Sequence, residues 1–145
     1  VLHDVRILYS EESTLEYYNP TKWSKTMPKF VSETMVEGLY ITHRNLEQGK
    51  SISIVTTSAL TTSRHRKGDN LAYICVFGSC WELQFDKLPE SVYEDTCIPW
   101  RDQKLANKRQ AEDELLVTVA IKLATGFEHD TLEDLKRSKT LRKLS

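Results

Sequence analysis

The side chains of this sequence that could take part in chemistry are mainly basic ones, and they occur in clusters. Four cationic or titratable side chains follow one another in a short segment: Arg64, His65, Arg66 and Lys67. Five more lie in residues 136–145, which contain no acid: Lys136, Arg137, Lys139, Arg142 and Lys143. Cationic loops and tails of this kind bind phosphate backbones or anionic lipid headgroups. The two clusters therefore predict an anion-binding surface.

A smaller patch combines basic and aromatic residues nearer the N-terminus. Residues 17–32 contain no acid, and the candidate patch there consists of Lys22, Trp23, Lys25 and Lys29. Aromatic rings beside basic side chains are typical of proteins that bind single-stranded nucleic acid. The alternative is that these charges are only solvated, because acidic segments such as 112–114 balance them to a net charge of −1. That net charge excludes a globally basic protein but not a local basic surface.

No catalytic motif is recognisable. The five glycines are isolated from one another, so phosphate-binding glycine loops are missing. A nucleophile elbow and a zinc-protease helix are missing as well. The four histidines all lie in polar surroundings typical of exposed side chains: His3, His43, His65 and His129. We therefore expect no catalytic site and no cofactor, and a hydrolase or transferase with a scattered site is only the third hypothesis.

The cysteines favour a reducing compartment, the cytoplasm or the nucleus. Cys75, Cys80 and Cys97 are an odd number for a disulfide framework, and no glycosylation sequon is present. Cys75 and Cys80 have the widest spacing used by zinc-binding pairs, but Cys75 lies in an apolar run. Buried free thiols are therefore expected rather than a metal site. No apolar run approaches the about 20 residues of a membrane span.

Apolar patterning predicts an antiparallel meander of about five strands. Trp81, Leu83 and Phe85 alternate with polar residues, as in a strand with one wet face. Gly78-Ser79 before them suits a two-residue type II′ hairpin turn. The strands are expected at residues 3–9, 35–43, 51–60, 70–77 and 80–86.

The C-terminal third changes to helical patterning. Residues 101–125 contain neither glycine nor proline, and Gly126 is a natural stop after them. The apolar second half of this helix should be buried, whereas its charged first half should project or lie on the surface. Trp100 is a candidate interface anchor, although packing against the helix is the commoner role. A second, short helix begins near Asp130.

Strands followed by a long helix predict an α+β domain at residues 1–130, with the helices packed on one face of the sheet. Residues 131–145 are expected as a short helix that runs into a basic tail. Our first hypothesis for function is a non-enzymatic protein–protein interaction or assembly subunit, cellular or viral, that binds a protein partner or itself. Its contacts would be an exposed sheet edge and the charged first half of the 101–125 helix.

The alternative hypothesis is a small nucleic-acid-binding module. Its contacts would be the basic segment 64–67 and the tail 136–143. Peripheral contact with an anionic membrane is less favoured, because the leucines near the C-terminus would point to opposite sides of a helix.

Overall fold

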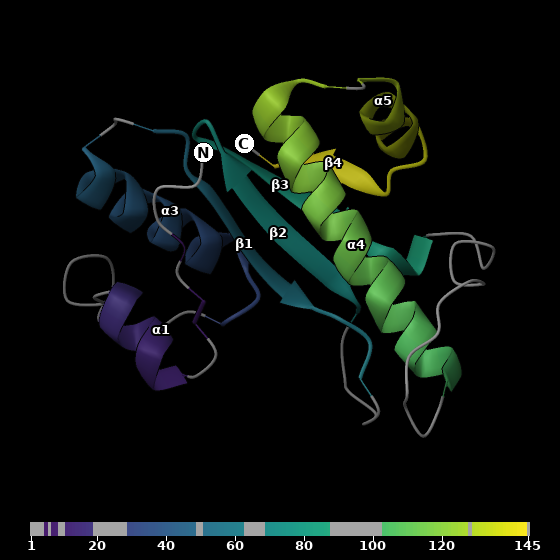
Figure 1. Cartoon of the computed structure of the whole chain (residues 1–145), viewed down its shortest axis with the longest axis horizontal. Helices are drawn as coiled ribbons and strands as arrows, with labels where there is room; N and C mark the ends of the chain where they lie inside the picture. Colours follow the sequence, from purple (N-terminus) through teal and green to yellow (C-terminus); the bar gives the residue numbers. More distant parts are fainter. Residues whose placement is uncertain are drawn as a thin grey trace.

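The computed structural model of this chain describes residues 5, 7–8, 11–18, 29–48, 51–62, 69–87, 103–127 and 129–144. For residues 11, 12, 15, 18, 103–105 and 129 it describes the backbone alone. The described part is an α+β structure around a four-stranded antiparallel sheet in the order β1-β2-β3-β4 (Figure 1). The strands are β1 (Ile54–Ala59), β2 (Leu71–Val76), β3 (Ser79–Gln84) and β4 (Leu141–Lys143). The predicted class is confirmed, with four strands rather than about five.

Among the described residues of the segment 3–9, no strand of this sheet is found. Val5, Ile7 and Leu8 are the described residues of that segment, and none of them is in a strand. Val5 and Ile7 are 61% and 65% exposed, so their alternating pattern has no buried face to pack on. Near the N-terminus the described residues contain the helix α1 (Glu11–Tyr18), which packs against α3 (Glu33–Glu47).

The segment 35–43, expected as a strand, is the middle of helix α3. Its buried residues Met35, Val36 and Leu39 have the spacing of one helix face. The helix begins where the Ser32 hydroxyl accepts a hydrogen bond from the Met35 N–H at 3.1 Å, with Glu33 in the first turn. A short apolar run suits a strand or a helix by periodicity alone, and here the cap and the buried face select the helix.

The predicted central hairpin is present, but its turn lies one residue earlier than expected. β2 and β3 pair up to Val76↔Ser79, so the two loop residues are Phe77 and Gly78. Both have positive φ, 52° and 75°, as in a type I′ turn rather than the predicted type II′ turn. The hydroxyl of Tyr40 in α3 accepts a hydrogen bond from the Gly78 N–H at 3.0 Å. This hydrogen bond to α3, which is distant in sequence, thus stabilises a turn in which Phe77 has an unfavourable positive φ.

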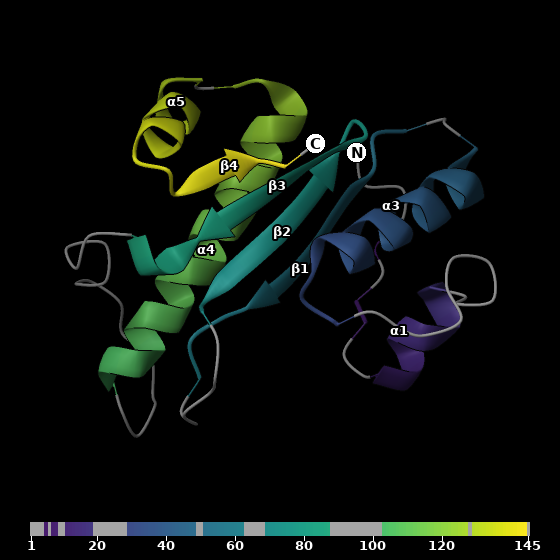
Figure 2. The same ribbon diagram turned by 180° about the vertical axis from the view of Figure 1, so that it is seen from behind.

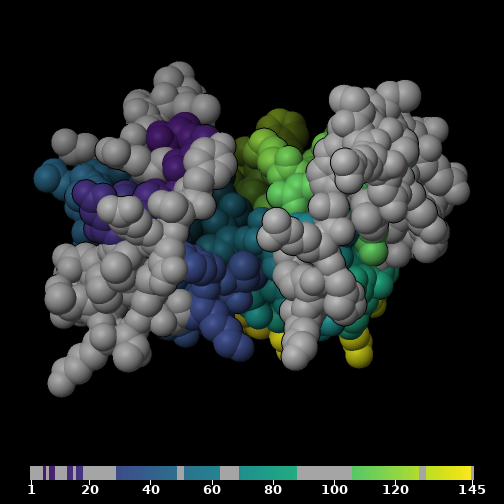
Figure 3. Space-filling view, turned by 90° about the horizontal axis from the view of Figure 1, so that it is seen from below, coloured from purple at the N-terminus to yellow at the C-terminus, as the bar shows by residue number. Residues whose placement is uncertain are grey.

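Helices cover both faces of the sheet, not one face as predicted. Alternate residues of β2 point to opposite sides: Ala72 and Ile74 pack with α4 (Gln103–Thr125), and Tyr73 and Cys75 pack on the side of α3. Figures 1 and 2 show α4 on one side of the strands and α3 on the other. In the view from below, the green atoms of α4 and the blue atoms of α3 lie on opposite sides of the teal strands (Figure 3). β2 is apolar throughout because both its faces are covered.

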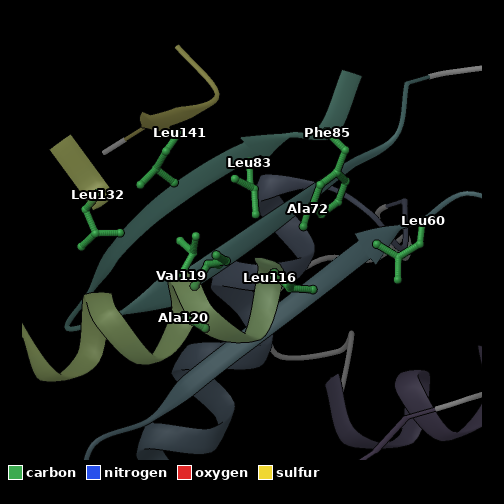
Figure 4. Packing of buried hydrophobic residues seen from close by; sticks show 10 residues of the cluster. Leu60, Ala72, Leu83, Phe85, Leu116, Val119, Ala120, Leu132 and Leu141 are labelled. Atoms are coloured by element: carbon green, nitrogen blue, oxygen red, sulfur yellow. The ribbon is translucent and has the colours of Figure 1, made fainter. Parts of the chain in front are cut away.

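The long helix expected at residues 101–125 is α4. It ends at Gly126, which has a φ of 72° and completes the last turn. One face of the apolar second half packs on the sheet, where Leu116 and Val119 join Leu83 in the main core (Figure 4). The second half was expected to be buried, but Val117 and Ile121 remain 51% exposed on its other face.

The first half of α4 does not project freely. Ala106, Ala111 and Glu112 are buried there, so this half also has a face that packs against the rest of the protein. Of the two alternatives expected for the charged half, the described residues fit the one in which it lies on the surface, with Asp113 and Glu114 exposed.

The residues expected to form a basic tail are folded into the sheet. Helix α5 (His129–Arg137) is followed by β4, which pairs antiparallel with β3. Leu141 is buried in the main core together with Leu132 of α5. The Leu144 N–H donates to the Cys80 carbonyl at 2.8 Å. Burial of Leu141 and pairing with β3 hold this short strand in place.

Candidate functional site

The outer edge of β1 is an unpaired edge of the sheet formed by the described residues. Along an antiparallel strand, alternate residues form backbone hydrogen bonds to the strand on one side and to the strand on the other side. The two-residue hairpin loop fixes which residues of β2 bond to β3, so the alternate residues of β2 bond to β1. On this pattern three residues of β1 bond to β2: Val55, Thr57 and Ala59. The other three direct their N–H and C=O groups outward: Ile54, Thr56 and Ser58. We call these three residues the β1 edge, and no other strand of the described chain pairs with it.

The two edges of the sheet differ in how they are protected. Natural edge strands discourage pairing by being short or by carrying charged residues, above all lysine. β4 has both features, because it is three residues long and contains Arg142 and Lys143. β1 is six residues long, and the whole run 51–62 lacks charge and proline. The β1 edge therefore has the character of a strand that accepts a partner.

Exposed apolar side chains occur both on β1 and on α4, the helix that packs against β2. Ile54 is 42% exposed, and Val117 and Ile121, one turn apart on α4, are each 51% exposed. The opposite flank of α4 is occupied by α5, where Lys122 Nζ donates to Thr131 Oγ1 at 3.2 Å. Figure 1 shows α5 on one side of α4, and β2 between α4 and β1 on the other side. We call Ile54, Val117 and Ile121 the apolar flank, because each is an exposed apolar side chain on β1 or α4.

Beyond the end of β1, a group of polar side chains holds the backbone of Thr61. Glu112 Oε1 accepts from the Thr61 N–H at 2.8 Å, and Arg109 Nη1 donates to the Thr61 carbonyl at 2.9 Å. Asn70 Nδ2 donates to Thr61 Oγ1 at 2.9 Å. We call these four residues the Thr61 clamp. It bonds Thr61, before the segment 63–68, to α4 and bonds Asn70, after that segment, to Thr61.

Glu112 is the unusual member of the Thr61 clamp. Its side chain is fully buried, and Oε2 has no hydrogen-bond partner in the described part of the structure. Sequence reasoning missed it, because an acid between Ala111 and Asp113 reads as a solvated charge. Its spacing of four residues before Leu116 places it on the buried face of α4, and that spacing is the signal that could have found it.

Several predicted site residues lie outside the described residues. They are Arg64, His65, Arg66 and Lys67 of the basic segment, Lys22, Trp23 and Lys25 of the aromatic patch, and Trp100. The remaining member of the aromatic patch, Lys29, is exposed, and its carbonyl accepts from the Ser32 hydroxyl at 2.7 Å.

The basic residues of 136–143 are spread over α5, β4 and the turn between them rather than along a tail. Three of them have acidic partners: Lys136 with Glu133 at 3.1 Å, Arg137 with Asp134 at 3.3 Å, and Arg142 with Glu82 at 3.2 Å. The ammonium groups of Lys136 and Lys143 lie 5.1 and 5.9 Å from the centre of the Trp81 ring. Arg142 and Lys143 are neighbours in a strand, so their side chains point to opposite faces of the sheet. This part of the predicted anion-binding surface is therefore divided between the two faces.

One pair of side chains resembles a nucleophile with its base. His43 Nδ1 lies 2.7 Å from Ser53 Oγ, joining α3 to the segment before β1. Ser53 is only 2% exposed, so a substrate has no access to its hydroxyl. The pair is better explained as a structural contact between the helix and the strand.

Cys75 and Cys80 lie directly opposite each other on β2 and β3. Both thiols are free and buried, as predicted, and they pack with Val36 of α3. Burial raises the pKa of both thiols, which also hydrogen-bond to each other. The third cysteine, Cys97, lies outside the described residues.

Among the described residues, neither a metal-binding cluster nor a membrane-spanning helix is found. No group of three or more histidine, cysteine or acidic side chains is arranged to hold a metal ion. No described helix has the length and apolar character needed to cross a membrane.

Comparisons with known proteins gave no match for this chain, whether with family models, curated proteins or solved structures.

Proposed function

We propose that this protein is a non-enzymatic assembly or interaction subunit that binds a protein partner by adding a strand to the β1 edge. The observation that carries the proposal is the row of outward backbone groups of Ile54, Thr56 and Ser58 on an uncharged strand. Strand addition of this kind takes its affinity from main-chain hydrogen bonds and its specificity from the adjoining side chains. Ile54 of the apolar flank supplies one such adjoining side chain.

The charged first half of α4 supports the proposal less well than the sheet edge. Arg109 and Glu112 are used by the Thr61 clamp, and Gln110 donates to Glu114 at 2.8 Å. A partner that docked on this half-helix would have to compete with contacts inside the protein. We therefore assign the main contact to the β1 edge.

A single substitution at the β1 edge tests this function. Thr56→Lys places a charge on the edge at an exposed side chain whose backbone groups do not bond to β2, so the fold should persist. Thr118→Lys, at an exposed position of α4, is the matched control. Tagged versions of the three proteins are used for affinity capture, and each captured partner is then titrated in purified form. We expect at least tenfold weaker binding for Thr56→Lys alone, and equal binding by all three proteins would contradict the proposal.

The second candidate function is nucleic-acid binding by the basic segment 64–67. The observation in its favour is the Thr61 clamp, which holds Thr61, shortly before this segment, against α4 and bonds Asn70, shortly after it, to Thr61. Replacing Arg64, Arg66 and Lys67 together by Glu should abolish salt-sensitive binding of mixed-sequence RNA or DNA while leaving partner capture intact. The measurement is fluorescence anisotropy at about 50 and about 200 mM salt, the range in which phosphate contacts weaken most. If the wild-type protein does not bind RNA or DNA at the lower salt concentration, nucleic-acid binding is excluded as its function.

A further inference from the structure

We propose that the strand added at the β1 edge is β1 of a second copy of this chain. Two four-stranded sheets then join into one continuous sheet across a two-fold axis that passes between the two β1 strands. This inference rests on the proposed function and names its partner.

The register of the pairing follows from the backbone of β1. Two antiparallel β1 strands can meet with Thr56 of each copy opposite Thr56 of the other, and Ile54 then lies opposite the second copy's Ser58. These are the three residues whose N–H and C=O groups point outward, so this register uses every outward group of the strand. The central Thr56 pair exchanges two hydrogen bonds, with the Cα atoms about 5.5 Å apart.

The charge pattern favours a copy of the same strand over a chemically different partner. In this register every residue of β1 faces a residue of the same uncharged run, 51–62, so like charges are never opposed. Opposed threonines are a favourable cross-strand pair. A basic or acidic partner strand would find no opposite charge here, and nucleic acid would find no cation. The edge is therefore neutral and self-complementary.

The apolar flank gives a second reason for self-association. A two-fold axis normal to the sheet keeps the α4 helices of both copies on the same face, with the paired β1 strands between them. Adjacent strands are about 4.8 Å apart, so Ile54 of each copy lies close to the axis. Pairing therefore covers part of the exposed Ile54 side chain of each copy, and Val117 and Ile121 of both copies lie on the same face of the joined sheet.

Analytical ultracentrifugation of the full chain from nanomolar to high-micromolar concentration tests the dimer. We expect the wild type to dimerise reversibly and Thr56→Lys to weaken dimerisation at least tenfold, because it opposes two like charges at the two-fold axis. The control Thr118→Lys should dimerise like the wild type. A wild type that is monomeric throughout, or a dimer that Thr56→Lys does not weaken, overturns this inference.

A cross-linking measurement tests the register and does not depend on the effect of added charge. Two introduced thiols at the axis would lie within the Cα separation of a disulfide, so Thr56→Cys should form a covalent dimer on mild oxidation. Thr118→Cys and the wild type, which carries the native cysteines, are the controls and should not cross-link. Failure of Thr56→Cys to exceed them overturns the register. If the chain is monomeric but Thr56→Lys still loses a captured partner, the second-copy inference fails while the proposed function stands.

Discussion

Removal of the buried carboxyl of Glu112 is the sharpest test of how the base of the basic segment is held. Glu112→Ala leaves the Thr61 N–H buried without an acceptor, because Thr61 itself is only 5% exposed. A buried donor without a partner costs about 1–3 kcal/mol, and the one lost methylene adds about 0.8 kcal/mol. Removing a carboxylate whose Oε2 has no partner among the described residues offsets part of this cost. We expect a net loss of about 2–3 kcal/mol in the free energy of unfolding.

Urea unfolding followed by circular dichroism measures this loss directly. At this chain length the same change lowers the melting temperature by about 4–12 °C. Glu112→Gln keeps an acceptor of the same shape for Thr61, so it should cost less than about 1 kcal/mol. Asp113→Ala removes an exposed charge from the next position of α4 and should stay within about 0.5 kcal/mol of the wild type. The reasoning is refuted if Glu112→Ala is as stable as Asp113→Ala.

The remaining predictions concern the buried thiols, the hairpin turn and the start of α3. Burial raises the pKa of the Cys75 and Cys80 thiols above the ordinary 9.0, so above pH 9 the unfolded chain releases protons that the folded chain keeps. The free energy of unfolding should then fall by up to about 1.4 kcal/mol per pH unit for each thiol as the pH rises above 9. Measured by urea unfolding, this fall should be less steep in Cys80→Ala than in the wild type. An unchanged slope in Cys80→Ala would contradict the prediction. Phe77→Asn should increase the free energy of unfolding by about 1 kcal/mol and raise the melting temperature, because asparagine tolerates the φ of 52° in a type I′ turn. A lower melting temperature would show that the packing of the Phe77 ring stabilises the protein. Ser32→Ala should cost about 1 kcal/mol in urea unfolding by removing the cap of α3, and an equally stable variant would show that the cap is dispensable.

Local patterns in the sequence determined α4, the β2–β3 hairpin and the burial of two cysteines. The helix could be predicted because glycine and proline are absent from 101–125 and a glycine follows. The hairpin could be predicted because Leu83 and its neighbours alternate around a glycine turn. These patterns depend only on residues close together in the sequence, so they predict the local structure without knowledge of the tertiary contacts.

The candidate site was predictable only in outline. A sheet edge was expected as a contact surface, but the sequence did not say which strand would be outermost. The Thr61 clamp joins residues far apart in the chain, such as Thr61 and Glu112, so no local pattern reports it. The basic residues near the C-terminus were found by composition, yet their division between the two faces follows from the pairing of β4.

The tertiary structure decided which role each ambiguous segment takes. Residues 35–43 have side chains that suit a strand or a helix, and they are helical because Met35 and Val36 pack beneath the sheet while Ser32 caps the helix. Residues 141–143 carry two charges in three positions, yet they form a strand because Leu141 fills the core beside β3. The long-range burial of a few side chains outweighs weak local preference, and only the folded arrangement shows which side chains are buried together.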